Sequence, residues 1–256
     1  MRTKRLTATL LAVFFIFAIL LSCIFIFSIQ KLNVKFNADT QIETSSVQKD
    51  LEQFNNKNIF FFKLEEVERV VSKYPYFKLE KVYKSYPNVI CVELSQRVPV
   101  YNYVVGESVY LIDKTGFVLE ELSVSNFESR DLVTIDLSYD RVDSLDLNVG
   151  SVVDALDDEL FTAVLNMCES IALTDCVNAI YVNGHPEFKD VMFSTNSGVD
   201  IEITSATVRG DEKIAFAMQS YHNAKDYYKT FDTITVFVLE ADGSITCEWT
   251  SWKKGE

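Results

Sequence analysis

The chain has 256 residues, a formal net charge of -13, and 48% hydrophobic residues. Removing the three basic residues among the first nine leaves the remainder at -16, a charge that repels phosphate backbones and anionic lipid surfaces and disfavours nucleic-acid binding. The composition still supplies enough apolar material for one large or two modest folded domains.

The first feature in chain order is an uncharged apolar stretch from Leu10 to Phe27. As a helix rising about 1.5 Å per residue, this stretch with Ser28 and Ile29 reaches roughly 30 Å, the thickness of a bilayer core. The three basic residues precede it, and the more basic flank stays in the cytoplasm. The sequence therefore predicts a cytoplasmic tail at 1–9, a transmembrane helix at 10–29, and extracytoplasmic domains after it.

Two alternatives to an uncleaved anchor exist for this stretch. A cleaved secretory signal would end in small residues, whereas this run ends in Phe-Ser-Ile-Gln-Lys. The segment Leu20–Cys23 loosely resembles a lipoprotein signal, but apolar residues follow Cys23 directly where a polar tether is usual. An uncleaved anchor fits better than either, with Cys23 as an apolar side chain facing lipid.

The four remaining cysteines all follow the apolar stretch: Cys91, Cys168, Cys176 and Cys247. Disulfides are permitted outside the membrane, and the pair closest in sequence is Cys168 with Cys176. Buried free thiols are the alternative. Because no CxxC motif occurs, a structural zinc site is not indicated.

Residues 30–100 predict a small α+β domain. Leu32, Val34 and Phe36 alternate with polar residues as in a half-buried strand. Ser45 and Gln48 offer a capping box for a first helix, and a second helix is predicted at 64–71, ahead of Tyr74-Pro75. Strands are predicted at 77–86 and 89–96, so the order is βααββ.

The run from Val82 to Val100 reads V-Y-K-S-Y-P-N-V-I-C-V-E-L-S-Q-R-V-P-V. It is similar to the V-x-R-x-W-P-N-T-h-x-I-x-V-x-E-R-x-P-V run of the bacterial cell-division proteins FtsQ and DivIB, where h is apolar. Tyr86 stands where Trp is usual and Gln96 where Glu is usual. Asn58-Ile59-Phe60 also resembles the family's N-L-F. The resemblance implies that 30–100 is a POTRA domain.

Residues 101–256 predict a larger mixed antiparallel β domain with packed helices. Gly116 supplies the turn of a hairpin that resembles the opening of the DivIB β domain. Further strands are predicted at 132–137, 145–149, 179–182 and 191–203, the last folding at 195–198. Helices are predicted at 154–172 and 211–224, because apolar residues recur there on one face.

The last predicted hairpin, 233–239 with 245–249, contains the candidate partner-binding residues. Ile245 and Trp249 alternate onto one face of a strand at the edge of the sheet, and edge strands accept strands from partners. The alternative is that Trp249 fills the domain core. From position we predict partner contacts at Phe237, Leu239, Ile245, Trp249 and Trp252.

The sequence carries no signature of catalysis, a bound metal or a cofactor. His185 lies in a turn-like segment and His222 ends a helix, and neither has a nucleophile motif beside it. The carboxylate clusters at 65–66, 120–121 and 157–159 lack EF-hand spacing, and solvated surfaces are their ordinary explanation. We therefore expect no catalytic residues, no metal and no cofactor.

The resemblance to FtsQ and DivIB implies a non-enzymatic divisome scaffold at the division septum. Such proteins dock single-pass coiled-coil partners, FtsL and DivIC or FtsB, against the end of the β domain. These partners act in turn on the septal peptidoglycan synthase. The alternative from another class is a membrane-anchored extracytoplasmic cell-wall enzyme or ligand-binding sensor.

Overall fold

The structure is a computed structural model that describes residues 2–37, 40–123, 132–137, 147–153, 158–171, 176–183, 186–223, 231–239 and 242–251. The chain divides into two compact units, Met1–Arg97 and Val98–Glu256. Each unit has its own buried cluster of apolar side chains, and each is described separately below.

The first unit begins with helix α1 (Arg2–Ile26). Its large apolar side chains are exposed, among them Phe14 at 67% and Phe25 at 74%. Within the part of the chain that the structure describes, no helix combines the length and the apolarity that crossing a membrane requires. The transmembrane helix at 10–29 accordingly stays a prediction.

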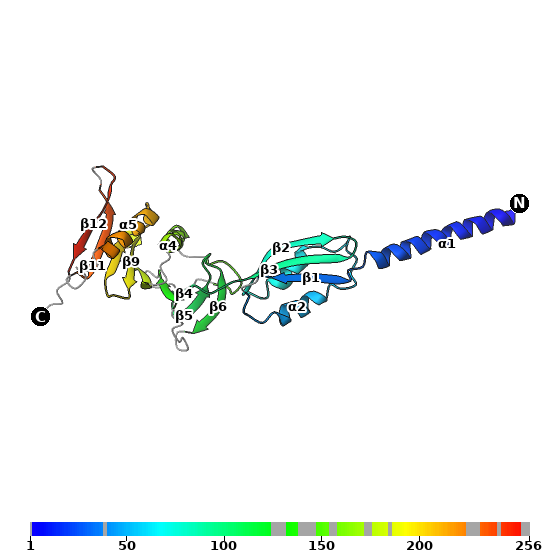
Figure 1. Cartoon of the computed structure of the whole chain (residues 1–256), viewed down its shortest axis with the longest axis horizontal. Helices are drawn as coiled ribbons and strands as arrows, with labels where there is room; N and C mark the ends of the chain where they lie inside the picture. Colours follow the sequence, from blue (N-terminus) through cyan, green and yellow to red (C-terminus); the bar gives the residue numbers. More distant parts are fainter. Residues whose placement is uncertain are drawn as a thin grey trace. The chain divides into compact units, whose positions relative to one another are not determined.

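After α1, the first unit folds as a three-stranded sheet with two helices (Figure 1). The elements are β1 (Lys31–Phe36), α2 (Ser45–Glu52), α3 (Glu65–Val71), β2 (Phe77–Ser85) and β3 (Val89–Gln96). β3 lies in the middle, parallel to β1 and antiparallel to β2. Parallel pairing of β1 with β3 is possible because helices α2 and α3 intervene in the chain.

The core of this unit forms between the helices and the sheet. The helices contribute Val47, Leu51 and Val67, and β3 contributes Ile90 and Val92, all of them at most 1% exposed. The predicted capping box is wrong. Thr44 precedes α2 without a side-chain cap bond, and the Ser45 hydroxyl donates to Glu43 instead, because Ser45 is already the first helical residue.

The second unit is built on one mixed sheet, with α4 (Asp158–Ile171), α5 (Gly210–Asn223) and a short 3-10 turn at Pro186–Phe188. In its described residues the strands are β4 (Tyr101–Val105), β5 (Ser108–Ile112), β6 (Val118–Ser123), β7 (Val133–Asp136), β8 (Val177–Asn183), β9 (Asp190–Thr195), β10 (Asp200–Ile203), β11 (Thr233–Val238) and β12 (Ile245–Thr250).

The strand order in this sheet is β12-β11-β10-β9-β8-β7-β4-β5-β6. Hairpins make the antiparallel pairs, whereas β4 with β7, β7 with β8 and β10 with β11 are parallel. The crossover from β10 to β11 includes α5, which lies against β10, β11 and β12 (Figure 1). The order therefore places the last strand, β12, at one edge.

Helices α4 and α5 pack against each other and supply one side of the core of the second unit. Leu160, Val164 and Met167 of α4 and Ile214 of α5 are completely buried, as the predicted apolar stripes require. The class of fold predicted from the sequence, α+β with a mixed sheet, is thereby confirmed for the described residues.

Two strand assignments in this unit differ from the structure. Strand β4 was not predicted, and the strand predicted at 145–149 is wrong over its described part, where 147–150 is loop and turn. A backbone bond from Gly150 N to Val118 O shows that this turn closes against β6 instead of forming a strand. The cysteines were left open between a disulfide and free thiols, and all five, each in a described position, are free.

Candidate functional site

The candidate site is the edge of the large sheet that β12 forms. β11 and β12 pair antiparallel over six residues each, from Thr233 opposite Thr250 to Val238 opposite Ile245. On its other side β12 has no neighbouring strand among the residues that the structure describes. Because an edge strand presents unpaired backbone N–H and C=O groups, this side of β12 can accept a strand from a partner.

One face of β12 holds the strand on the core. Ile245, Cys247 and Trp249 pack against the buried cluster, and the Trp249 ring lies 5.8 Å from the Phe231 ring in an edge-to-face contact. The sulfur of Cys247 is 3.9 Å from the hydroxyl of Ser220 in α5. This face is therefore partly buried, and it fixes the strand against α5.

The opposite face of β12 is more open. Glu248 and Thr250 are exposed, and Thr246 is half-buried beside Phe237, its partner across the β11–β12 ladder. A peptide that pairs with the edge would contact these side chains together with the backbone.

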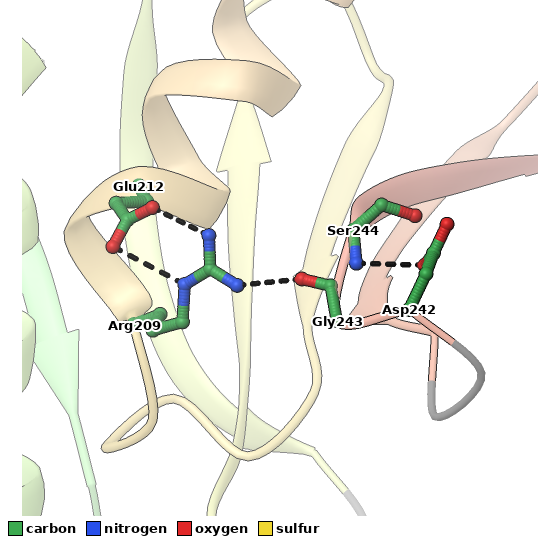
Figure 2. A network of polar contacts seen from close by, with 5 residues as sticks. All are labelled: Arg209, Glu212, Asp242, Gly243 and Ser244. Atoms are coloured by element: carbon green, nitrogen blue, oxygen red, sulfur yellow. Dashed lines mark hydrogen bonds and ion pairs between the residues drawn. The ribbon is translucent and has the colours of Figure 1, made fainter.

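The β11–β12 turn is tied to the start of α5 by one arginine, as Figure 2 shows. The Arg209 guanidinium donates to the carbonyl of Gly243 at 2.7 Å and to both carboxylate oxygens of Glu212, at 3.2 and 2.6 Å. Within the turn, the Ser244 N–H donates to the Asp242 carboxylate at 2.9 Å. These contacts determine where the turn that begins β12 lies relative to α5.

The charges of this network reinforce its hydrogen bonds. The bond from Arg209 holds the pKa of the Glu212 carboxyl below its usual value, and the bond to Glu212 raises the pKa of Arg209. The backbone bond from Ser244 lowers the pKa of Asp242. All three groups are therefore charged at neutral pH, and since they face solvent their mutual attraction weakens with salt.

The segment that presents Arg209 is held from inside by a buried lysine. Lys213, 2% exposed, donates its ammonium to the carbonyls of Thr204 at 2.6 Å and Ser205 at 3.1 Å. Desolvation lowers the pKa of Lys213, while nearby Asp190 acts in the opposite direction. The turn between β10 and α5 is thus held by Lys213 beneath it and joined to the hairpin by Arg209.

The structure brings some of the predicted partner-binding residues together and separates others. Ile245 and Trp249 share the core-facing side of β12, whereas Phe237 lies on the opposite face of β11. Leu239 follows β11 and is 39% exposed. Trp252 lies outside the described residues. Partner contact at each of these residues stays a prediction.

Metal ligands and histidines are the groups that other chemistry would use. They contain no group of three or more His, Cys, Asp or Glu side chains that could hold a metal ion. His222 is exposed at the end of α5, and His185 lies outside the described residues. An open hollow of about 370 Å³ between α4 and α5 is lined partly by Asn166, Glu169 and Arg209, and the arginine already binds Glu212.

Reasoning from the sequence missed Arg209. A signal was available, because Arg209 and Glu212 are three residues apart at the start of a predicted helix, the spacing of an intrahelical ion pair. The bond from Arg209 to Gly243 spans 34 residues, and no local pattern indicates it.

Two curated proteins are similar to this chain over about half of it. Cell division protein DivIB of Clostridium tetani (strain Massachusetts / E88) is 28% identical over 127 residues, which cover 50% of this chain and 45% of that protein. Cell division protein DivIB of Clostridium acetobutylicum is 29% identical over 114 residues, 43% of each chain. The matches thus span less than half the length of these relatives.

A solved structure with some likeness is the major extracytoplasmic domain of the trans isomer of the bacterial cell division protein DivIB from Geobacillus stearothermophilus. It is 12% identical, with a TM-score of 0.27, and the match covers 47% of this chain and 87% of that one. No family model matches the chain.

The fold and the edge define a class: a two-unit α+β protein whose larger sheet, over the described residues, ends in the edge strand β12. The two curated relatives support the FtsQ/DivIB family of cell-division proteins. Both relatives are named for the family that the run Val82–Val100 resembles, so the resemblance predicted from the sequence is confirmed.

Proposed function

We propose that this chain is a cell-division protein that works as a membrane-anchored, non-enzymatic scaffold of the divisome. Both curated relatives are named for cell division, which supports the first part of the proposal. The observation that carries the scaffold role is the open edge of β12, which is held in place by the core on one face and by Arg209 at its turn.

The proposed partners are single-pass coiled-coil division proteins of the FtsL and DivIC or FtsB type. A segment of one partner adds to β12 as a further strand, with backbone hydrogen bonds giving affinity and the side chains beside Thr246 and Glu248 giving selectivity. The septal peptidoglycan synthase is then influenced indirectly. In this proposal the first unit is a POTRA domain, and the chain acts at the division septum.

The proposed anchor is the apolar stretch in α1. Leu10, Phe14 and Phe25 are 63%, 67% and 74% exposed, and each large apolar side chain left in water forgoes about 1.5–3 kcal/mol of burial. Lipid removes this penalty. Alkaline carbonate extraction tests the anchor, because an anchored chain should stay in the membrane fraction. Protease added to spheroplasts should digest the domains after α1, and their protection would contradict an extracytoplasmic location.

The non-enzymatic part of the proposal has its own test. Full-length protein incubated with purified peptidoglycan should release no soluble fragments. Release that is abolished by His185→Ala would instead support the cell-wall enzyme alternative.

The docking edge is tested by photo-crosslinking in cells. A photoreactive residue is placed in turn at Thr246, Glu248 and Thr250, and the adducts are identified by mass. We expect adducts with small single-pass coiled-coil proteins. The matched control is Ser123, an exposed position on β6 at the other edge of the same sheet, which should give none of these adducts.

Adducts with glycan alone would contradict partner docking at β12. Equal adducts from Ser123 and from β12 would show that the contact is not specific to this edge. Either result would move the proposed site away from the β11–β12 hairpin.

A further inference from the structure

The folded part of the first unit carries exposed aromatic side chains at one end. Between Ser28 and Arg97, the described residues with exposed large apolar side chains are Phe60 (53%), Phe61 (85%) and Tyr86 (57%). The Phe60 ring lies 5.4 Å from the Tyr86 ring and 4.6 Å from the Phe27 ring. Phe27, Phe60, Phe61 and Tyr86 are called the aromatic end below.

The aromatic end lies where α1 joins the sheet. The Ile59 N–H donates to the Phe27 carbonyl at 2.8 Å, and Ser28 forms a β-bridge with Asn58. The Gln30 N–H donates to the Asn88 carbonyl at 3.0 Å, which ties the same junction to the turn after β2. The aromatic end is therefore continuous with the exposed apolar side chains of α1.

The loop between α2 and α3 holds the rings of Phe60 and Phe61 on its outer side. Ile59 and Phe62 are buried in the core, at 0% and 3% exposed, so the two phenylalanines between them face outward. The Phe60 N–H donates to the Asn58 side chain at 3.0 Å, which helps to order the loop. Two exposed phenylalanines on an ordered loop are an unusual feature of a soluble surface, because their burial would gain free energy.

Lysines accompany the aromatic end although the chain as a whole is acidic. The Lys84 ammonium lies 3.5 Å from the Phe60 carbonyl. Lys57 pairs with Glu66 at 2.7 Å and lies over the Phe54 ring, and Lys31 is exposed at the start of β1. Aromatic rings with neighbouring lysines match the composition that proteins place at the lipid headgroup level.

We propose that the aromatic end inserts into the headgroup region of the bilayer and docks the first unit on the membrane surface. This inference rests on the proposed membrane anchor in α1. Phe61 enters the interface most deeply, Phe60 and Tyr86 lie beside it, and Lys84 contacts lipid phosphate. Insertion depends on the rings and not on net charge, so it persists on zwitterionic lipid despite the acidity of the chain.

The test uses the full chain in nanodiscs whose lipids include a gadolinium-chelating headgroup. A trifluoromethyl-phenylalanine is placed at Phe61 and, in a second sample, at Lys73. Lys73 is exposed and precedes β2, so it lies near the end of the sheet opposite the aromatic end. The two ends are separated by the length of β3, which is seven residue steps of about 3.3 Å, or roughly 23 Å. We expect the fluorine signal at position 61 to lose most of its intensity and the signal at position 73 to keep it.

A second variant examines the contribution of the rings. With the probe at Tyr86, Phe61→Ser should restore much of the attenuated signal, because the deepest ring is lost, whereas Lys73→Ser should restore none. Phe61 is 85% exposed, so Phe61→Ser should leave the melting temperature unchanged.

The outcomes separate the docking from the anchor. If the chain enters nanodiscs and position 61 behaves as position 73 does, docking is wrong and the anchor stands. If the chain does not enter nanodiscs, the anchor and the docking are both wrong. If attenuation at position 61 requires an added division protein, the aromatic end binds that protein, and the docking proposal is overturned.

Discussion

Arg209 has a left-handed backbone conformation, with φ at +54°, directly before α5. For a residue other than glycine this conformation costs on the order of 1–3 kcal/mol, so the surrounding contacts must compensate for it. The bonds to Glu212 and Gly243 are the described contacts of its side chain, and they connect the helix to the turn before β12.

Replacing Arg209 should therefore loosen the β11–β12 turn. Asn adopts the left-handed conformation more readily than Ala, yet both substitutions remove the guanidinium. We expect Arg209→Asn and Arg209→Ala to reduce crosslinking from Thr246 several-fold, with the lower melting temperature in Arg209→Ala. Full crosslinking in Arg209→Asn would show that the side chain does not position the hairpin.

Cys168 is buried in α4, and burial raises the pKa of its thiol to about 12. The folded chain keeps this proton at a pH where the unfolded chain releases it. The free energy of unfolding should therefore fall as pH rises above about 9, by about 1.4 kcal/mol per pH unit from this one group.

Urea unfolding of the native chain and of Cys168→Ala isolates this effect. Between pH 6 and 8 the two proteins should differ by a constant amount. Between pH 9 and 10 the native chain should lose about 1 kcal/mol of stability that Cys168→Ala does not lose, so the difference between the two proteins narrows by that amount. A difference that stays constant through pH 10 would contradict the raised pKa.

The β5–β6 hairpin shows how a turn can depend on a helix. Gly116 has a φ of +77°, and a Cβ there would lie 2.9 Å from Cε1 of Phe161 in α4. Gly106 in the β4–β5 turn has a φ of +58° but nothing within 4 Å of a Cβ. Gly116→Ala and Gly106→Ala both incur the cost of a positive φ at alanine, but only Gly116→Ala crowds α4. We expect Gly116→Ala to lower the free energy of unfolding by about 1–3 kcal/mol more than Gly106→Ala does, as measured by chemical denaturation.

Strand β12 combines a partly buried face with an edge. A substitution at this edge should therefore weaken partner binding without lowering the stability of the domain. Glu248→Lys places a long cationic side chain on the edge, which opposes strand addition. We expect partner binding in a pull-down to fall several-fold, with unfolding changed by less than about 0.5 kcal/mol. The Ser123→Lys variant, altered on β6 at the other edge, should bind the partner normally. Glu248→Gln removes the charge without adding a long side chain, so it shows whether the loss of binding comes from the missing carboxylate or from the obstructing lysine.

At the scale of the whole chain, the described residues form two buried apolar cores that share no residue. Ile90 lies in the first core and Ile201 in the second, and both are completely buried. Each Ile→Ala change should cost about 2–5 kcal/mol in its own unit. Differential scanning calorimetry should show Ile90→Ala lowering one transition and Ile201→Ala another. A single transition lowered equally by both would contradict independent cores.

The anchor and the aromatic end would connect these units to a bilayer. The exposed apolar side chains of α1 and the rings at Phe60 and Phe61 both belong to the first unit, whereas the open edge of β12 belongs to the second. On the proposed function, membrane contact and partner contact are thus divided between the two units.

Several parts of the fold and of the site could be predicted from the sequence. Alternation located β1, β3 and the β11–β12 hairpin, and apolar stripes located α4 and α5. β4 was missed, and the strand expected at 145–149 is wrong where it is described. Of the site, the edge hairpin was predicted, whereas Arg209 was not, because its contact with Gly243 joins distant parts of the chain.

The sequence determines periodicity, since a strand repeats every two residues and a helix every 3.6, and this was enough to place most helices and strands. Which strands lie next to each other in the sheet is decided by the tertiary structure alone. The alternation in β10 and β11 reads the same whatever strand lies beside each, so their parallel pairing and the position of β12 at the edge depend on how α5 crosses between them. Phe61 is exposed and Phe62 buried for the same reason: packing chooses which side of an apolar run faces the core.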